Sequence, residues 1–323
     1  MNDTKSDKTI SNPPVSDIGL RKGITVAELV KQFKNSGFQT HNIAVASEIL
    51  DSMARNNATI FLSFTSNISA SGIRGIIIDL VKRKKVHALV VSSGALDEDI
   101  TRAKMPYLQG TFEADDAELG RKGINRMGSI LVPNECYEYL EEKMTEVLNK
   151  IYSSNAGKEF TATELIKQVG LNLGTENSFV YHAAKNGIPI FCPGITDGAV
   201  GLQLAFFQQT HPDFKVNELK SAIEAIDFAM TAKKNGSGKV GAIILGGGIA
   251  KHHTIISNIL GGGLDYAIYV NSSSPYHGSL SGATTSEAKS WGKICADAKD
   301  VTVYGDASVV FPLIIASNDY FFD

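Results

Sequence analysis

The sequence has 323 residues, a formal net charge of −3 and an ordinary apolar content. This length allows a large core in one α/β domain or in two smaller domains, and we expect one because no linker composition separates two halves. Without a basic stripe, the charge argues against nucleic acid as a main partner. No apolar run is long enough to cross a bilayer, so we expect no membrane partner.

The first 20 residues are polar, contain two prolines and lack the apolar stretch of a signal peptide. We expect residues 1–20 to form a flexible arm and residues 21–323 to form a single α/β domain. Cys136, Cys192 and Cys295 are scattered, without the spacing of a zinc site or a disulfide framework. They fit a reducing cytoplasm and predict no bound metal.

Apolar periodicity predicts strands and helices in alternation along the rest of the chain. Helices are expected over residues 25–35, 41–56, 73–84, 134–152, 161–169, 178–186, 216–233, 249–260 and 285–297, with two more after Asp197 and Asp306. Strands are expected over residues 59–64, 86–92, 128–132, 188–192, 240–245, 265–271 and 301–305. Residues 100–122 are expected to be irregular. The alternation indicates an α/β, Rossmann-like fold, a mostly parallel sheet with helices on both faces.

Small or acidic residues follow five of these strands. The turns come after Phe64, Ser92, Leu245, Asn271 and Gly305. In a parallel sheet these turns meet at one edge, where open α/β sheets bind their ligands. Together they predict a groove of dinucleotide size, which no single turn would indicate.

Each turn has a ligand-binding and a purely structural interpretation. Residues 65–72 could present N–H groups to a phosphate or be a plain tight turn. The acids at 97–99 could line a site or face solvent. Asp197 and Asp306 could bind a ligand or cap the helices that follow them. The glycines at 246–248 leave room above the sheet for a cofactor.

The stretch around the single tryptophan predicts a nucleophile. Lys293 lies two residues after Trp291, and a lysine kept partly out of water is neutral more often and attacks imines and carbonyls. The alternative is an amphipathic helix with Trp291 in the core and Lys293 in solvent. A Ser- and Gly-rich loop over residues 272–285 precedes it and favours a functional role. His252, behind the triple glycine, is a candidate general base.

The order of several motifs resembles the deoxyhypusine synthase family, in its prokaryotic or archaeal-like branch, from about Gly37 to the C-terminus. The motifs are Thr65-Ser66-Asn67, Ser71-Gly72-Ile73-Arg74, Gly123-Ile124-Asn125-Arg126, Thr196-Asp197-Gly198, Gly246-Gly247-Gly248, Lys251-His252-His253, Ser281-Gly282-Ala283, Ser290-Trp291-Gly292-Lys293-Ile294 and Asp306-Ala307-Ser308-Val309-Val310-Phe311-Pro312. The resemblance implies NAD-dependent transfer of the aminobutyl group of spermidine to one lysine of a translation factor. It assigns the enzyme imine to Lys293 and proton transfer to His252. It also implies a cytoplasmic homotetramer with sites between subunits.

The resemblance also implies two sets of binding residues. NAD would be held by Ser66, Asn67, Ile68, Ser69, Ala70, Ser92, Ser93, Gly94, Asp197, Gly247, Ser272, Ser273, Asp306 and Ala307. The polyamine would be held by Asp97, Glu98, His252, Gly278, Ser279, Glu287, Trp291 and Lys293.

Three positions depart from the eukaryotic pattern of this family. Leu202, Leu280 and His277 stand where that pattern has acids. A buried cation needs a paired carboxylate, so these changes predict that one amine end of the substrate is bound differently. Free-polyamine transfer that makes homospermidine from putrescine therefore stays open, as does use of agmatine. A non-catalytic regulatory subunit is a third possibility.

Overall fold

The computed structural model describes residues 12–322. The α-helices are α1 (Val26–Gln32), α2 (Phe38–Arg55), α3 (Ser66–Ala70), α4 (Ile73–Lys82), α5 (Ser93–Arg102), α6 (Asp116–Arg121), α7 (Asn134–Ser154), α8 (Ala162–Leu173), α9 (Phe179–Asn186), α10 (Ala199–Thr210), α11 (Glu218–Lys234), α12 (Gly248–Ser257), α13 (Thr285–Ser290) and α14 (Ala307–Ala316). The strands are β1 (Thr59–Phe64), β2 (Ala88–Val91), β3 (Leu108–Gln109), β4 (Ile124–Met127), β5 (Ile130–Pro133), β6 (Glu159–Thr161), β7 (Ile190–Phe191), β8 (Lys215–Asn217), β9 (Val240–Leu245), β10 (Leu264–Asn271) and β11 (Ile294–Tyr304).

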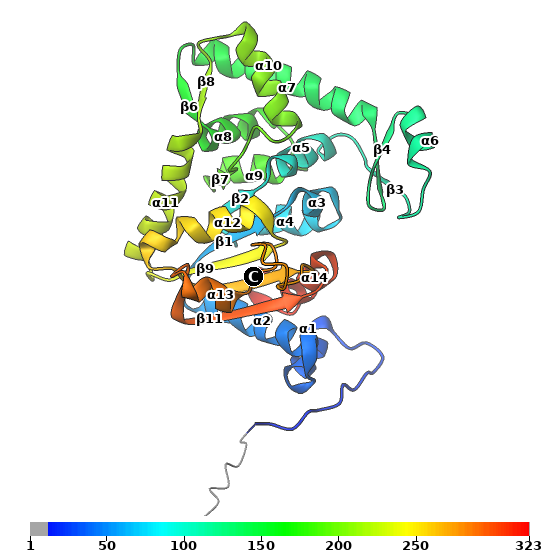
Figure 1. Ribbon diagram of the computed structural model, residues 1–323, viewed down its shortest axis with the longest axis vertical. Coiled ribbons are helices and arrows are strands. Elements are labelled where there is room, and N and C mark those ends of the chain that lie inside the picture. The colour runs from blue at the N-terminus through cyan, green and yellow to red at the C-terminus, as the bar shows by residue number, and fades with distance from the viewer. Residues whose placement is uncertain (1–11, 323) are drawn as a thin grey trace, which may run out of the picture.

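Six strands form one sheet in the order β11-β10-β9-β1-β2-β7, and every neighbouring pair is parallel. Helices α11, α12 and α13 contact one face, and α2 and α14 contact the other. Figure 1 shows α12 and α2 on opposite sides of β9. The predicted α/β class, with its parallel sheet and two helical layers, is confirmed. Two small sheets, β3-β5-β4 and β6-β8, lie apart from the main one.

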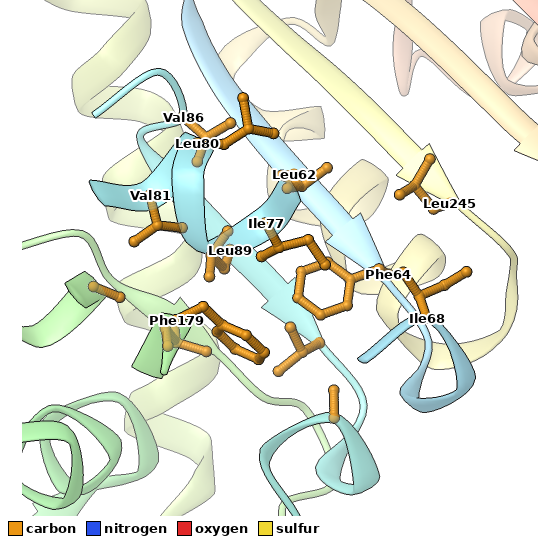
Figure 2. Close-up of a cluster of buried hydrophobic side chains, with 14 of the residues drawn as sticks. Leu62, Phe64, Ile68, Ile77, Leu80, Val81, Val86, Leu89, Phe179 and Leu245 are labelled. Atoms are coloured by element: carbon orange, nitrogen blue, oxygen red, sulfur yellow. The ribbon is translucent and has the colours of Figure 1, made fainter. Parts of the chain in front are cut away.

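The sheet has two helical layers because its strands are apolar on both faces. Successive side chains of β1 point to opposite sides, so Leu62 and Phe64 join one core cluster while Phe61 joins the other. In Figure 2, Leu62 and Phe64 lie beside Ile77 and Leu80 of α4. The buried side chains of Ile77 and Leu80 therefore hold α4 against this face of the sheet.

A buried ion pair joins three helices beside this core. Arg74 of α4 donates from Nε to Asp99 Oδ1 of α5 at 2.7 Å, and both side chains are almost fully buried. The carboxylate of Asp99 also accepts from the Ser178 hydroxyl and from the N–H groups of Phe179 and Val180 at the start of α9. These contacts use the acceptors that a buried carboxylate must satisfy.

The predicted acidic turn after β2 is wrong, because residues 93–102 form helix α5 and all three acids are buried. The sequence 65–72, predicted as a turn, contains the short helix α3. Residues 100–122, predicted as irregular, contain β3 and α6. The helix predicted over 161–169 is confirmed as α8, with the capping box of Thr161 and Glu164 at its start.

The helix predicted over residues 285–297 is too long. Helix α13 ends at Ser290, Trp291 is its C-cap, and Gly292 has φ +67°, which suits glycine and stops the helix. Lys293 therefore lies in the connection to β11, and its carbonyl accepts from Leu264 N–H at 3.1 Å.

The predicted N-terminal arm falls only partly within the described residues. Residues 1–11 lie outside them, whereas residues 12–20 are exposed and contain no helix or strand. Gly19 N–H donates to Gln32 Oε1 of α1 at 2.7 Å. No helix between residues 12 and 322 is both long and apolar enough to cross a membrane.

We predict that Asp99→Asn lowers the free energy of unfolding by about 3–5 kcal/mol, because it leaves the Arg74 guanidinium buried without its anion. Urea unfolding followed by circular dichroism measures this. Glu118→Gln removes an exposed carboxylate that pairs with Lys122 on α6 and serves as the control. It should cost at most about 1 kcal/mol. Equal losses in the two variants would contradict the assigned role of Asp99.

Candidate functional site

The parallel strands bring the predicted cofactor residues to one edge of the sheet. Ser66–Ala70 follow β1, Ser92–Gly94 follow β2, Asp197 follows β7, Gly247 follows β9, Ser272 and Ser273 follow β10, and Asp306 and Ala307 follow β11. The predicted convergence of the turns is therefore confirmed by the topology. That these residues hold NAD remains a prediction.

Neighbouring turns at this edge approach closely because glycines face them. A Cβ added to Gly94 would lie 2.9 Å from Ser66 Cβ, and one added to Gly246 would lie 2.9 Å from Thr65 Oγ1. A Cβ on Gly247 would lie 2.7 Å from the Ser281 backbone. Glycine is required at these positions to pack one turn against the next.

Several buried polar groups at the same edge have no hydrogen-bond partner within the described residues. Within residues 12–322, the hydroxyls of Ser69 and Ser92 and Nδ2 of Asn271 are buried and make no hydrogen bond. Helix α5 begins directly after β2, and its N-cap, Ser92, makes no side-chain capping bond. Free hydroxyls beside a helix N-terminus suit the hydroxyl and phosphate groups of a nucleotide.

A cavity of about 140 Å³ lies on the α12 face of the sheet. It is lined by Lys251, Ile255, Tyr269, Gly278, Leu280, Ala283, Thr284, Glu287, Ala288, Trp291 and Lys293. Six of these residues come from the loop over residues 272–284 or the start of α13. The cavity thus combines two amines, one carboxylate and apolar walls. A site of this kind can hold an aliphatic amine and carry out chemistry on it.

Lys293 is half-buried in this cavity, with Nζ 5.3 Å from the centroid of the Trp291 ring. The indole itself is 66% exposed, so the chain alone does not enclose the amine as a dry pocket would. Burial lowers the pKa of His252, and the nearby charge of Lys293 lowers it further. His252 is therefore neutral near pH 7 and can accept a proton.

Lys251 is the residue that the sequence interpretation left without a role. Its side chain is completely buried, and Nζ donates to the carbonyls of Ala283 at 2.7 Å and Ser281 at 3.3 Å. It also lies 4.5 Å from the centroid of the Tyr269 ring. Burial lowers its pKa to about 8. The sequence signal was present, since Lys251 opens the Lys251-His252-His253 motif.

The two acids predicted to bind the polyamine differ in what they contact. Both carboxylate oxygens of Asp97 accept from backbone N–H groups at the start of α10, from Ala199 at 2.7 Å and Val200 at 2.8 Å. Asp97 thus caps α10. Glu98 is only 3% exposed, and its Oε2 has no hydrogen-bond partner within the described residues. Burial raises its pKa to about 7.

Asp97 and Glu98 do not line the cavity of Lys293. They follow β2, which β9 and β1 separate from β10, a span of about 14 Å at the usual spacing of strands. Gly278, Glu287, Trp291 and Lys293 do share the cavity. His252 and Ser279 are not among its lining residues, so the cavity brings together four of the eight predicted polyamine residues.

The interpretation of Asp197 as a helix cap is wrong. Gly198 is the N-cap of α10, and Asp97 supplies the capping carboxylate instead. A Cβ on Gly198 would lie 2.8 Å from Asp97 Oδ2, which explains the glycine. Asp306 does cap its helix, accepting from Ser308 N–H at 2.7 Å. Capping leaves its second carboxylate oxygen for other partners.

A larger cavity, of about 380 Å³, lies at the opposite end of β1. Its lining includes Thr59, Val86, His87, Ile188 and Phe228. It contains none of the predicted site residues and only one lysine, Lys84. We place the chemistry in the smaller cavity because its reactive groups converge there. Across residues 12–322, no group of three His, Cys, Asp or Glu side chains is arranged to hold a metal ion.

Comparisons with known proteins agree on one family. The family model described as deoxyhypusine synthase matches residues 28–318. A probable deoxyhypusine synthase of Thermoplasma acidophilum is 45% identical over 311 residues, covering 96% of this chain and 98% of that protein. Its counterpart in Schizosaccharomyces pombe is 38% identical over 311 residues, covering 92% and 87%.

Among solved structures, one described as a deoxyhypusine synthase from Entamoeba histolytica superposes with a TM-score of 0.67 at 26% identity, covering 92% of this chain and 94% of that one. The ternary complex of AgrE with ornithine and NAD+ has a TM-score of 0.54 at 14% identity, covering 87% and 33%. This second likeness concerns the fold alone.

We predict that Glu98→Gln stabilises the protein at pH 8 but not at pH 4. The raised pKa means that the folded chain binds a proton between pH about 4.5 and about 7 that the unfolded chain releases. The wild-type contribution is therefore present below pH 4.5 and lost as pH rises through 7, a change on the order of 3 kcal/mol. Urea unfolding at both pH values measures it, with the exposed Glu138→Gln as control. If the free energies of unfolding of Glu98→Gln and wild type differ by the same amount at both pH values, the raised pKa assigned to Glu98 is wrong.

Proposed function

Because the chain belongs to the deoxyhypusine synthase family, we propose that it transfers the aminobutyl group of spermidine, with NAD, to a lysine of the hypusine-containing translation factor. The observation that carries this proposal is the cavity in which Lys293, Glu287 and Trp291 converge. A primary amine there can form a covalent imine, and one carboxylate can pair with a substrate ammonium.

NAD would be held at the carboxyl edge of the sheet, in the single domain that we propose for residues 21–323. The hydroxyls of Ser69 and Ser92, which have no hydrogen-bond partner within residues 12–322, fit its ribose and phosphate groups, and Gly247 follows β9 at the same edge. When bound there, NAD would supply a hydride acceptor and, once reduced, a hydride donor. Asp306, Ala307, Ser272 and Ser273 would complete this site.

Lys293 and His252 would carry out the proton and group transfer. His252, held neutral by its surroundings, accepts a proton from the polyamine nitrogen. The Lys293 amine then attacks the oxidised polyamine carbon, forming its own imine with the four-carbon fragment and releasing diaminopropane. The acceptor amine displaces Lys293 in the same way. Glu287 pairs with the ammonium at the far end of the fragment.

The leucines that replace family acids limit how many cations the cavity can neutralise. Leu280 lines the cavity, while Leu202 lies on α10 with 51% of its surface exposed. Glu287 is thus the one carboxylate among the lining residues. The site of a single chain balances one ammonium, and Glu98 lies outside it. Completion of the polyamine site by a second chain, as in a homotetramer, would bring a further acid to the substrate.

Exposed apolar side chains support such an assembly. Leu219 and Ile223 of α11 and Ile256 of α12 are 82%, 56% and 40% exposed, and α11 contacts α12. Apolar residues gathered on adjacent helices are typical of subunit interfaces. We propose that this face, together with the exposed Trp291, contacts other copies of the chain.

For the chemistry, purified protein is incubated with NAD, labelled spermidine and either the translation factor or putrescine, and borohydride then traps any enzyme imine. We expect label on the factor and a trapped adduct on Lys293. Lys293→Ala should abolish both, whereas Lys289→Ala, which removes a neighbouring lysine paired with Asp300, should retain them. Label in homospermidine alone would favour free-polyamine transfer. Absence of label from every product would favour a regulatory subunit.

For the assembly, light scattering coupled to size exclusion should give four times the chain mass. Ile223→Asp places a charge on the proposed contact and should shift the mass to a smaller species. Leu171→Asp, at a similarly exposed leucine on α8, serves as the control and should leave the mass unchanged. A wild-type mass equal to one chain would refute the proposed tetramer.

A further inference from the structure

The loop over residues 272–284 is ordered by contacts to the amino end of α12. Within the loop, Gly282 N–H donates to Ser279 O at 3.0 Å and Gly278 N–H to Pro275 O at 3.2 Å. A Cβ on Gly282 would lie 1.9 Å from Ser274 O, so the loop folds back tightly on itself. These turns set its internal shape but do not attach it to the rest of the protein.

Ser281 and Lys251 make that attachment. Ser281 Oγ accepts from Gly248 N–H at 3.0 Å, and Gly247 packs directly against Ser281. The Lys251 ammonium donates to the carbonyls of Ser281 and Ala283. Lys251 has no carboxylate within ion-pair distance among residues 12–322. The two carbonyls and the Tyr269 ring therefore offset the desolvation cost of burying its ammonium.

Lys251 is poorly placed to be a second nucleophile. Its side chain is completely buried, and Nζ points to two backbone carbonyls. Lys293, by contrast, is half-buried, and its Nζ donates no hydrogen bond to any of residues 12–322. The two lysines of the cavity thus have different roles. Lys251 binds the loop that forms one wall, whereas the amine of Lys293 is available to a ligand.

We propose that Lys251 and Ser281 form a latch, which positions the loop over residues 272–284 and thereby sets the wall of the cavity opposite Lys293. Gly278 and Leu280, which line that cavity, lie on the latched segment. Lys251 also adjoins His252 in α12, so the latch fixes the loop relative to the proposed base. Lys251 and Ser281 are positioning residues. Their effect on transfer rests on the proposed function, whereas their effect on the loop does not.

Hydrogen exchange followed by mass spectrometry tests the latch directly. In Lys251→Met, which keeps an unbranched apolar stem and removes the ammonium donors, amides of residues 272–284 should exchange about tenfold faster or more, as loss of hydrogen bonds to a charged group implies. Amides of β9 should keep their wild-type rates. Ser281→Ala should accelerate the same loop by a smaller factor, and it decides the question if Lys251→Met does not fold.

Lys233→Met is the matched control. Lys233 is also largely buried, but it pairs with Asp265 at 2.6 Å, at the start of β10 and away from the loop. The Lys233→Met variant should leave the exchange rates of the amides in residues 272–284 unchanged. The latch would be overturned if these amides exchanged at the wild-type rate in Lys251→Met or Ser281→Ala. It would also be overturned if exchange accelerated equally in every segment of the protein.

A second readout separates the latch from the proposed function. If wild type forms the borohydride-trapped adduct on Lys293, Lys251→Met should form it about tenfold more slowly or less. A wild type without any adduct would overturn the proposed function, while the exchange result would still decide the latch. An adduct formed at the wild-type rate by a variant with a loosened loop would refute the positioning role.

Discussion

The carboxyl ends of six parallel strands meet at one edge, and the arrangement of the site depends on this constraint. A parallel sheet needs a helical crossover after each strand, so each strand end is also the start of a turn or helix. The turns after β1, β2 and β9 then pack against one another through Gly94 and Gly246. Within residues 12–322, buried hydroxyls without hydrogen-bond partners lie among them, which gives this edge its capacity for a polar ligand.

The cavity of Lys293 is built differently, on the face of the sheet. Its floor is Tyr269 in β10, its sides are α12 and α13, and its outer wall is the loop over residues 272–284. The loop closes over β10 because Lys251 and Ser281 hold it to α12. The edge and the cavity share this loop, so a ligand at Ser272 and Ser273 and an amine beside Lys293 would contact the same segment.

The sequence predicted the strands well where apolar runs were long and bounded by small residues, as in β1 and β9. It failed at residues 93–102, since burial of Asp97 and Asp99 depends on helix starts at Val200 and Phe179, which lie 80 or more residues later. Such distant partners leave no local pattern. The end of α13 was different, because Gly292 is a local stop signal that the prediction passed over.

Lys251 shows a similar limit for the site. A lysine beside two histidines suggests chemistry, but its burial depends on carbonyls 30 residues further along. From the sequence, we expected Lys293 to be the lysine most removed from water. In the structure of one chain, Lys251 is the more buried of the two. Lys293 is favoured by its place beside Trp291 and His252 and by the family motif.

The most direct test of the central claim is a crystal structure of the protein soaked with NAD and a non-cleavable spermidine analogue. The analogue should lie in the cavity beside Lys293 and Glu287, with the dinucleotide along the turns after β1, β2 and β9. An analogue bound instead in the larger cavity beside Phe228, at the opposite end of β1, would contradict the account.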